Sequence, residues 1–137
     1  MNLFADSSAL AKRYIADESS EDLDTLLKST TSLGVSVLCL PEIISALCRR
    51  RRERHLKPSE YTVAKEALET DLSDATVIQI VDEVVLNCVR LLETNRLRAS
   101  DAIQISSALV WKADLFVSAD ADQCAAARAF GLDIVRL

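Results

Sequence analysis

The chain has 137 residues, half of them hydrophobic and 27% charged, and its formal net charge is −5. This length suffices for a single core, and only 2 Gly and 2 Pro leave little room for flexible linkers, so we predict one domain spanning residues 1–137. No uncharged apolar stretch reaches roughly 18 residues, and no basic region followed by a long apolar run opens the chain. We therefore expect no membrane span, and a soluble, cytoplasmic protein.

The predicted strands and helices alternate along the chain. In chain order they are a strand at 2–5, helices at 7–16 and 20–30, a strand at 34–38, helices at 42–54 and 58–71, a strand at 75–80, helices at 83–94 and 99–112, a strand at 115–118, a helix at 122–130 and a strand at 132–135. Gly131 is expected to end the last helix. Strands separated by helices are typical of parallel sheets covered on both faces, so we predict a three-layer α/β/α fold with a central, mostly parallel sheet of four or five strands.

Cysteine and histidine are poorly placed for metal binding. The single histidine, His55, lies in a basic segment, so the ligands of most His-based sites are lacking. The four cysteines have no CxxC spacing and lie among aliphatic residues, where each can act as a small buried hydrophobe; they are Cys39, Cys48, Cys88 and Cys124. Any metal ion would therefore have to be held by oxygen.

Two aspartates follow predicted strands. Asp6 ends the first apolar run and begins an Asp-Ser-Ser helix cap, and Asp120 stands in the same position after the strand at 115–118. Ligands of open α/β sheets bind outside the carboxyl ends of the strands, so these two carboxylates can be neighbours in space. Each could instead be only a helix cap, because Asp at a helix start is stabilising without any function.

Two further acids, Glu42 and Asp101, lie in the first turns of predicted helices. Each could be no more than a favourable charge at a helix N-terminus. Gathered together, however, the four carboxylates would repel one another, and a hard cation such as Mg²⁺ or Mn²⁺ would stabilise them when ionised. Such a cation can orient a water molecule and neutralise charge on a phosphodiester, which makes hydrolysis without a covalent nucleophile one chemistry open to this pattern.

Four short segments carry these acids, namely Asp6–Tyr14, Leu40–Glu42, Leu97–Gln104 and Phe116–Asp120. In this order and spacing they resemble the motifs of the PIN-domain ribonucleases, and among them the small VapC-type toxins of bacterial toxin-antitoxin systems. The resemblance covers essentially the whole chain. It implies a PIN-like fold and a Mg²⁺- or Mn²⁺-dependent endoribonuclease that cuts RNA. It further implies a protein that is often a homodimer and is inhibited by a cognate antitoxin, which inserts a segment into or beside the active-site cleft.

The resemblance also implies a role for each acid. Asp6 and Asp101 would bind the metal directly. Glu42 would bind it or position the attacking water, and Asp120 would complete the site.

Three further polar residues lie beside these acids. Ser7 and Ser118 match small hydroxyl positions of the family and could hydrogen-bond the carboxylates or a substrate phosphate. Asp122 could join the acidic cluster or cap the following helix, and we favour the cap.

A basic segment contrasts with the acidic chain and contains Arg49, Arg50, Arg51, Arg52 and Arg54. A local cationic strip of this kind can contact RNA or an antitoxin despite the unfavourable net charge. Basic residues near a helix C-terminus also complement the helix dipole, and we favour this simpler interpretation. Aromatic residues are too scattered to form a base-stacking platform, so Trp111 is expected in the core or at an interface.

Other classes of function are weaker or remain open. A phosphatase with an aspartate nucleophile after the first strand would need a second Asp two residues later, where Ser8 stands. A catalytically inactive PIN-like binding module remains an alternative, although all four acidic positions are filled. An RNA-processing nuclease outside a toxin-antitoxin system is the other alternative, since the same site can act on different RNAs.

Overall fold

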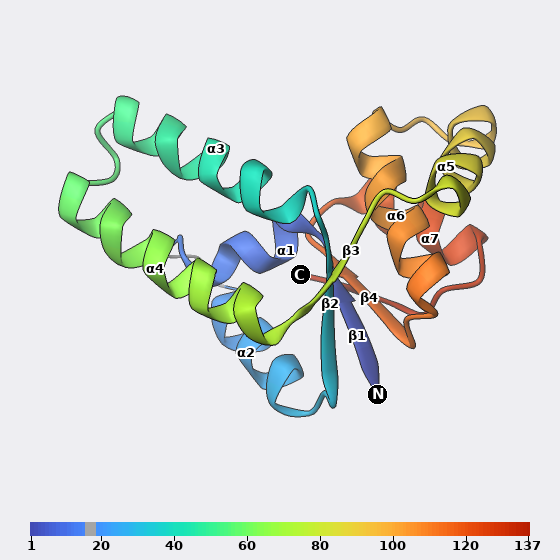
Figure 1. Cartoon of the computed structure of the whole chain (residues 1–137), viewed down its shortest axis with the longest axis horizontal. Helices are drawn as coiled ribbons and strands as arrows, with labels where there is room; N and C mark the ends of the chain where they lie inside the picture. The colour runs from blue at the N-terminus through green and yellow to red at the C-terminus, as the bar shows by residue number, and fades with distance from the viewer. Residues whose placement is uncertain (16–18) are drawn as a thin grey trace.

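The computed structural model describes residues 1–15 and 19–137 (Figure 1). Its sheet has five strands in the order β3-β2-β1-β4-β5, and every neighbouring pair is parallel. The strands are β1 (Asn2–Ala5), β2 (Ser32–Ser36), β3 (Thr76–Ile78), β4 (Leu115–Ser118) and β5 (Ile134–Arg136). The predicted α/β fold with a central parallel sheet is confirmed.

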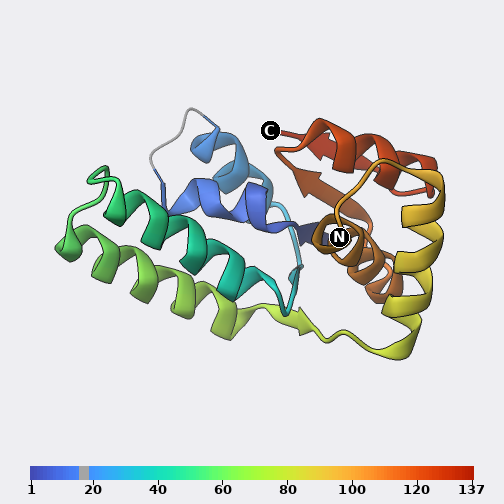
Figure 2. The same ribbon diagram turned by 90° about the horizontal axis from the view of Figure 1, so that it is seen from above.

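Helices cover both faces of this sheet, as the view in Figure 2 shows. Helices α1 to α4 pack on one face and α5 to α7 on the other, so the fold has three layers. The helices in the described residues are α1 (Ser7–Leu10), the short 3₁₀ helix η1 (Ala11–Arg13), α2 (Ser20–Lys28), α3 (Cys39–Arg52), α4 (Pro58–Asp74), α5 (Asp82–Thr94), α6 (Ala99–Trp111) and α7 (Ala121–Ala129).

The central strand β1 is buried from both sides, which explains its continuous run of apolar residues. Successive side chains of a strand point to opposite faces. Leu3 and Ala5 accordingly belong to the core under α1 to α4, and Phe4 belongs to the core under α5 to α7. On that second face the Phe4 ring stacks on Phe116 of β4, with ring centroids 5.9 Å apart.

Some predicted boundaries were displaced. Strand β2 begins two residues before Gly34, and α3 begins at Cys39 because the Ser36 hydroxyl accepts a hydrogen bond from the Leu38 N–H and closes the turn early. Pro41 still lies in the first helical turn, where its missing N–H has no partner to lose. The helix predicted at 7–16 is divided into α1 and η1, and its end at Ala16 lies outside the described residues.

Gly131 and the four cysteines have the roles that the sequence predicts. Gly131 has a φ of +93° directly after α7, as expected for a glycine that ends a helix. All four cysteines are free, three of them buried and Cys48 partly buried. Within the described ranges, no helix has the length and apolar character needed to span a bilayer.

Strand order determines where ligands can bind. The chain moves outward from β1 through β2 to β3, and then returns to the other side of β1 to form β4 and β5. The direction of winding therefore reverses between β1 and β4, which makes this place the topological switch point of the sheet. Open α/β sheets bind ligands outside the strand ends at such a point. Asp6 directly follows β1, and Asp120 lies two residues beyond β4.

Close packing between Gly34 of β2 and Trp111 of α6 fixes this helix against the sheet. A Cβ atom at Gly34 would lie 2.5 Å from Cζ3 of Trp111, which is closer than packed atoms allow. Trp111 is partly buried against the core, as predicted. We expect Gly34→Ala to lower the free energy of unfolding by about 1–3 kcal/mol through overpacking, measured by chemical denaturation.

A double-mutant cycle isolates this contact. In a Trp111→Leu background the same Gly34→Ala change should cost less, because the clashing ring is gone. An equal cost in both backgrounds would contradict the proposed contact.

Candidate active site

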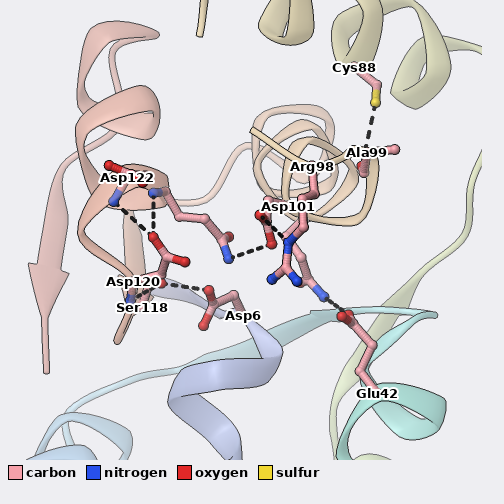
Figure 3. A network of polar contacts seen from close by, with 11 residues as sticks. Asp6, Glu42, Cys88, Arg98, Ala99, Asp101, Ser118, Asp120 and Asp122 are labelled. Atoms are coloured by element: carbon pink, nitrogen blue, oxygen red, sulfur yellow. Dashed lines mark hydrogen bonds and ion pairs between the residues drawn. The ribbon is translucent and has the colours of Figure 1, made fainter. Parts of the chain in front are cut away.

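Asp6 is the buried carboxylate at the centre of the site, with no exposed surface. As the N-cap of α1, its Oδ1 accepts hydrogen bonds from the Ala9 N–H at 2.9 Å and the Ser8 hydroxyl at 2.8 Å. Its Oδ2 accepts one from the Ser118 hydroxyl at 2.6 Å, as Figure 3 shows. All three donors are neutral, so the negative charge of Asp6 is stabilised without being cancelled.

The pKa of Asp6 is raised from 3.8 to about 6, mainly by burial and also by the nearby charge of Asp120, and the three donors oppose this rise. Removal from water disfavours the charged form of a carboxylate. At neutral pH the ionised Asp6 is therefore held at a cost in stability that a nearby cation would offset.

Asp120 lies beside Asp6 and caps α7. Its Oδ1 accepts hydrogen bonds from the N–H groups of Asp122 at 2.8 Å and Gln123 at 3.1 Å. Its own N–H donates to the Ser118 hydroxyl at 3.0 Å. Ser118 thus links the ends of β1 and β4 by donating to Asp6 and accepting from Asp120.

Glu42 reaches the site from the first turn of α3. Its Oε1 accepts hydrogen bonds from the Ser7 hydroxyl at 2.9 Å and from Nε2 of Gln104 at 2.7 Å. Gln104 Nε2 also donates to the Ser7 hydroxyl at 2.8 Å. The thiol of Cys39 is hydrogen-bonded to Ser7, but burial raises its pKa to about 12, so it is not a reactive thiolate.

Asp101 comes from the first turn of α6. Its Oδ1 accepts a hydrogen bond from Nε2 of Gln123 at 3.1 Å, and its Oδ2 lies 3.4 Å from Nε of Arg98. The Arg98 side chain is 82% exposed, so this ion pair is weak and easily rearranged.

The structure thus brings the four predicted acids to one end of the sheet from four separate segments, as Figure 3 shows. Their carboxylate oxygens are the ligands that Mg²⁺ and Mn²⁺ prefer, and the excess of negative charge suits a cation, so the residues fit such an ion in their chemistry. Within residues 1–15 and 19–137, no three His, Cys, Asp or Glu side chains are arranged so that they could hold a metal. Each of the four carboxylates accepts a hydrogen bond from a donor of its own.

Asp122 lies at the edge of the site. Asp120, rather than Asp122, is the N-cap of α7, so the predicted capping role of Asp122 was wrong. Asp122 is exposed in the first turn of the helix. With Asp101 and Asp120 it lines a groove of about 530 Å³, which Arg96 and Arg98 also line.

The arginine segment lies elsewhere. Arg49 to Arg52 form the last turn of α3, and Arg54 follows it in the left-handed conformation, with a φ of 61°. Arg52 lies ten positions after Glu42 in the helix, which corresponds to about 15 Å along its axis. Figure 1 shows α3 and α4 extending together away from α6 and α7. Arg51 lies over the Tyr61 ring at 4.4 Å, so it has a packing role there.

Four residues whose side chains contact the acids directly were missed as site residues, and two of them, Gln104 and Gln123, are buried; the other two are Ser8 and Arg98. Gln104 lies three residues after Asp101, and Gln123 three residues after Asp120. Residues at this spacing share one face of a helix, so the pattern could have indicated them. A single glutamine on an apolar helix is nevertheless a weak signal without the position of its partner.

The PIN domain family model matches residues 3–129, which is most of the chain. The chain belongs to the PIN domain family. Members of this family are typically nucleases that use divalent metals. No curated protein matches the sequence.

Solved structures share this PIN fold at low sequence identity. VapC20 of Mycobacterium tuberculosis, a toxin that cleaves the sarcin-ricin loop, is 18% identical with a TM-score of 0.71, over 98% of this chain and 99% of its own. A chain of VapBC2 from Rickettsia felis, bound to a DNA fragment from its promoter, is 14% identical with a TM-score of 0.72. The match covers 100% of this chain and 99% of the VapBC2 chain. A chain of VapBC-1 from nontypeable Haemophilus influenzae is 13% identical with a TM-score of 0.72. The match covers 99% of this chain and 98% of the VapBC-1 chain. These likenesses show the fold.

The raised pKa of Asp6 makes stability depend on pH. The folded protein binds a proton on the Asp6 carboxylate more tightly than the unfolded chain does. Protonation of Asp6 therefore contributes its full stability below pH 3.8, and this contribution is lost as the pH rises through about 6. In EDTA, we expect the unfolding free energy of the wild type to fall by about 2–3 kcal/mol relative to Asp6→Asn over this range.

Chemical denaturation at a series of pH values measures this difference. Asp133→Asn, which changes an exposed aspartate, is the control and should follow the wild type. If the free energies of unfolding of the wild type and of Asp6→Asn changed equally with pH, Asp6 would not have the raised pKa described above.

Proposed function

We propose that this PIN domain is a metal-dependent endoribonuclease that hydrolyses RNA phosphodiester bonds, and that it is the toxin of a toxin-antitoxin pair. The observation that carries the proposal is the meeting of four acids from separate segments at the switch point of a PIN fold. Apart from the exposed Arg98 beside Asp101, the donors described for these acids are neutral, so most of the negative charge remains available for a cation. A cellular RNA substrate and four free cysteines fit a cytoplasmic protein.

Each acid has a proposed role. Asp6 and Asp101 bind the metal directly, and Asp120 completes the site beside Asp6. Glu42 binds the metal or orients the attacking water through its carboxylate. Mg²⁺ or Mn²⁺, when bound, supplies positive charge for the phosphate oxygens and makes water a better nucleophile.

The groove beside Asp101 supports an RNA substrate. Arg96 and Arg98 are exposed on its wall, next to the acids, where they can contact the phosphates that flank the cut bond. A chain of net charge −5 needs such local cations to attract a polyanion.

Cleavage of total cellular RNA tests the proposed activity. We expect purified protein to make discrete cuts with Mg²⁺ or Mn²⁺ and none in EDTA, with the ends mapped by sequencing. Asp6→Asn and Asp101→Asn should each lower the rate at least about 100-fold, because each removes a charge that holds the cation. Asp133→Asn, at an exposed position away from these contacts, should cut like the wild type.

Other results would favour the alternatives. A folded wild type without cleavage, which binds RNA as well as its Asp6→Asn variant does, would indicate an inactive binding module. Cleavage without growth arrest on expression would indicate an RNA-processing nuclease outside a toxin-antitoxin system. Growth arrest that Asp6→Asn relieves would support a toxin.

A second cavity supports an antitoxin partner. It has a volume of about 510 Å³ and is lined by Arg13, Tyr14, Arg50 and His55 together with apolar residues of α4. The cationic side chains of Arg13 and Arg50 in its lining suit an acidic group of an inserted peptide. A similar chain, 15% identical with a TM-score of 0.69, comes from a toxin-antitoxin complex of Klebsiella pneumoniae.

An exposed apolar stripe on α5 supports the homodimer. Val85, Val89 and Leu92 lie on one side of the helix, following Val81, and are 37–49% exposed. Antiparallel packing of α5 against α5 of a second copy would bury the stripe on both copies, and a two-fold axis perpendicular to the helix produces this arrangement.

Light scattering tests this dimer. We expect the wild type to have about twice the chain mass of 15.1 kDa, and Val85→Glu and Val89→Glu to be monomeric, because each buries a charge in the interface. Val63→Glu, at an exposed valine of α4, is the matched control and should remain dimeric. Dimers of all three variants would place the interface elsewhere.

A further inference from the structure

Gln104 and Gln123 are buried side chains, only 2% and 4% exposed. Each donates its amide N–H to one acid, Gln104 to Glu42 at 2.7 Å and Gln123 to Asp101 at 3.1 Å. The Oε1 atom of each glutamine is buried without a hydrogen-bond partner. A buried acceptor without a partner destabilises the fold, so an apolar side chain of the same size would serve packing better at either position.

The two glutamines also connect the elements that carry the acids. Gln104 joins α6 to Glu42 of α3 and to the Ser7 hydroxyl of α1. Gln123 joins α7 to α6, since its backbone N–H donates to Asp120 and its side chain donates to Asp101. The distance between neighbouring acids therefore depends on these two amides.

Amide donors are suited to this position because they are neutral. A lysine or arginine in the same place would orient the carboxylate and also cancel its charge, which would weaken its attraction for a cation. An amide fixes the direction of the carboxylate and leaves its charge in place. Groups that hydrogen-bond metal ligands in this way commonly set the ligand orientation and the metal affinity.

We propose that Gln104 and Gln123 are positioning residues, which orient Glu42 and Asp101 toward a shared divalent cation. This inference rests on the proposed metal-dependent function. It adds two groups outside the four acids on which binding of the cation depends.

Mn²⁺ affinity of the full chain tests the proposal without requiring catalysis. Gln104→Met and Gln123→Met keep the size of the side chain and remove the donor, and Gln79→Met is the matched control at an exposed glutamine. By calorimetry on metal-free protein, we expect each buried variant to bind Mn²⁺ at least about 10-fold more weakly and the control to bind like the wild type. Unfolding temperatures in EDTA should be unchanged or higher, because an unpaired buried acceptor is removed.

Kinetics provide a second measurement. On an RNA that the wild type cuts, at a fixed Mn²⁺ concentration, kcat should fall in both variants while KM for RNA stays the same, because neither glutamine is proposed to touch the RNA.

The possible results separate the two proposals. Mn²⁺ binding by the wild type and equally by both variants would overturn the positioning role and leave the nuclease proposal intact. A weaker affinity accompanied by a lower unfolding temperature in EDTA would show a structural role and would also overturn it. A wild type that binds no Mn²⁺ would overturn both proposals.

Discussion

The Asp6 carboxylate is buried between the ends of β1 and β4, where only neutral groups donate hydrogen bonds to it. Burial opposes its charge, and Asp120 beside it adds repulsion. The sheet order makes this environment unavoidable, because β1 is the central strand and the winding reverses on its β4 side. A cation at this position would offset both the cost of burying the Asp6 charge and its repulsion by Asp120.

The site draws on all three layers of the fold. Asp6 follows the central strand, Glu42 comes from α3 on one face, and Asp101 and Asp120 come from the face covered by α6 and α7. Hydrogen bonds from Ser118 and from two glutamines connect these layers near the acids. The site can therefore assemble only when both helical layers are packed correctly against the sheet.

Much of this arrangement could be predicted from the sequence. Apolar runs ending at Asp6 and near Asp120 indicated the strands, and their position at strand ends predicted that the two carboxylates would be neighbours. The contacts of Gln104 could not be predicted, because they depend on how closely α6 approaches α3 across the sheet. The early start of α3 depended on a single turn closed by Ser36, which propensity does not reveal.

The central claim is that the four acids surround one divalent cation at the switch point. Crystals grown with Mn²⁺ test it most directly, because anomalous scattering locates the metal independently of activity. The account predicts a peak within about 2.3 Å of carboxylate oxygens of both Asp6 and Asp101. No peak at saturating Mn²⁺, or a peak bound only by other residues, would contradict it.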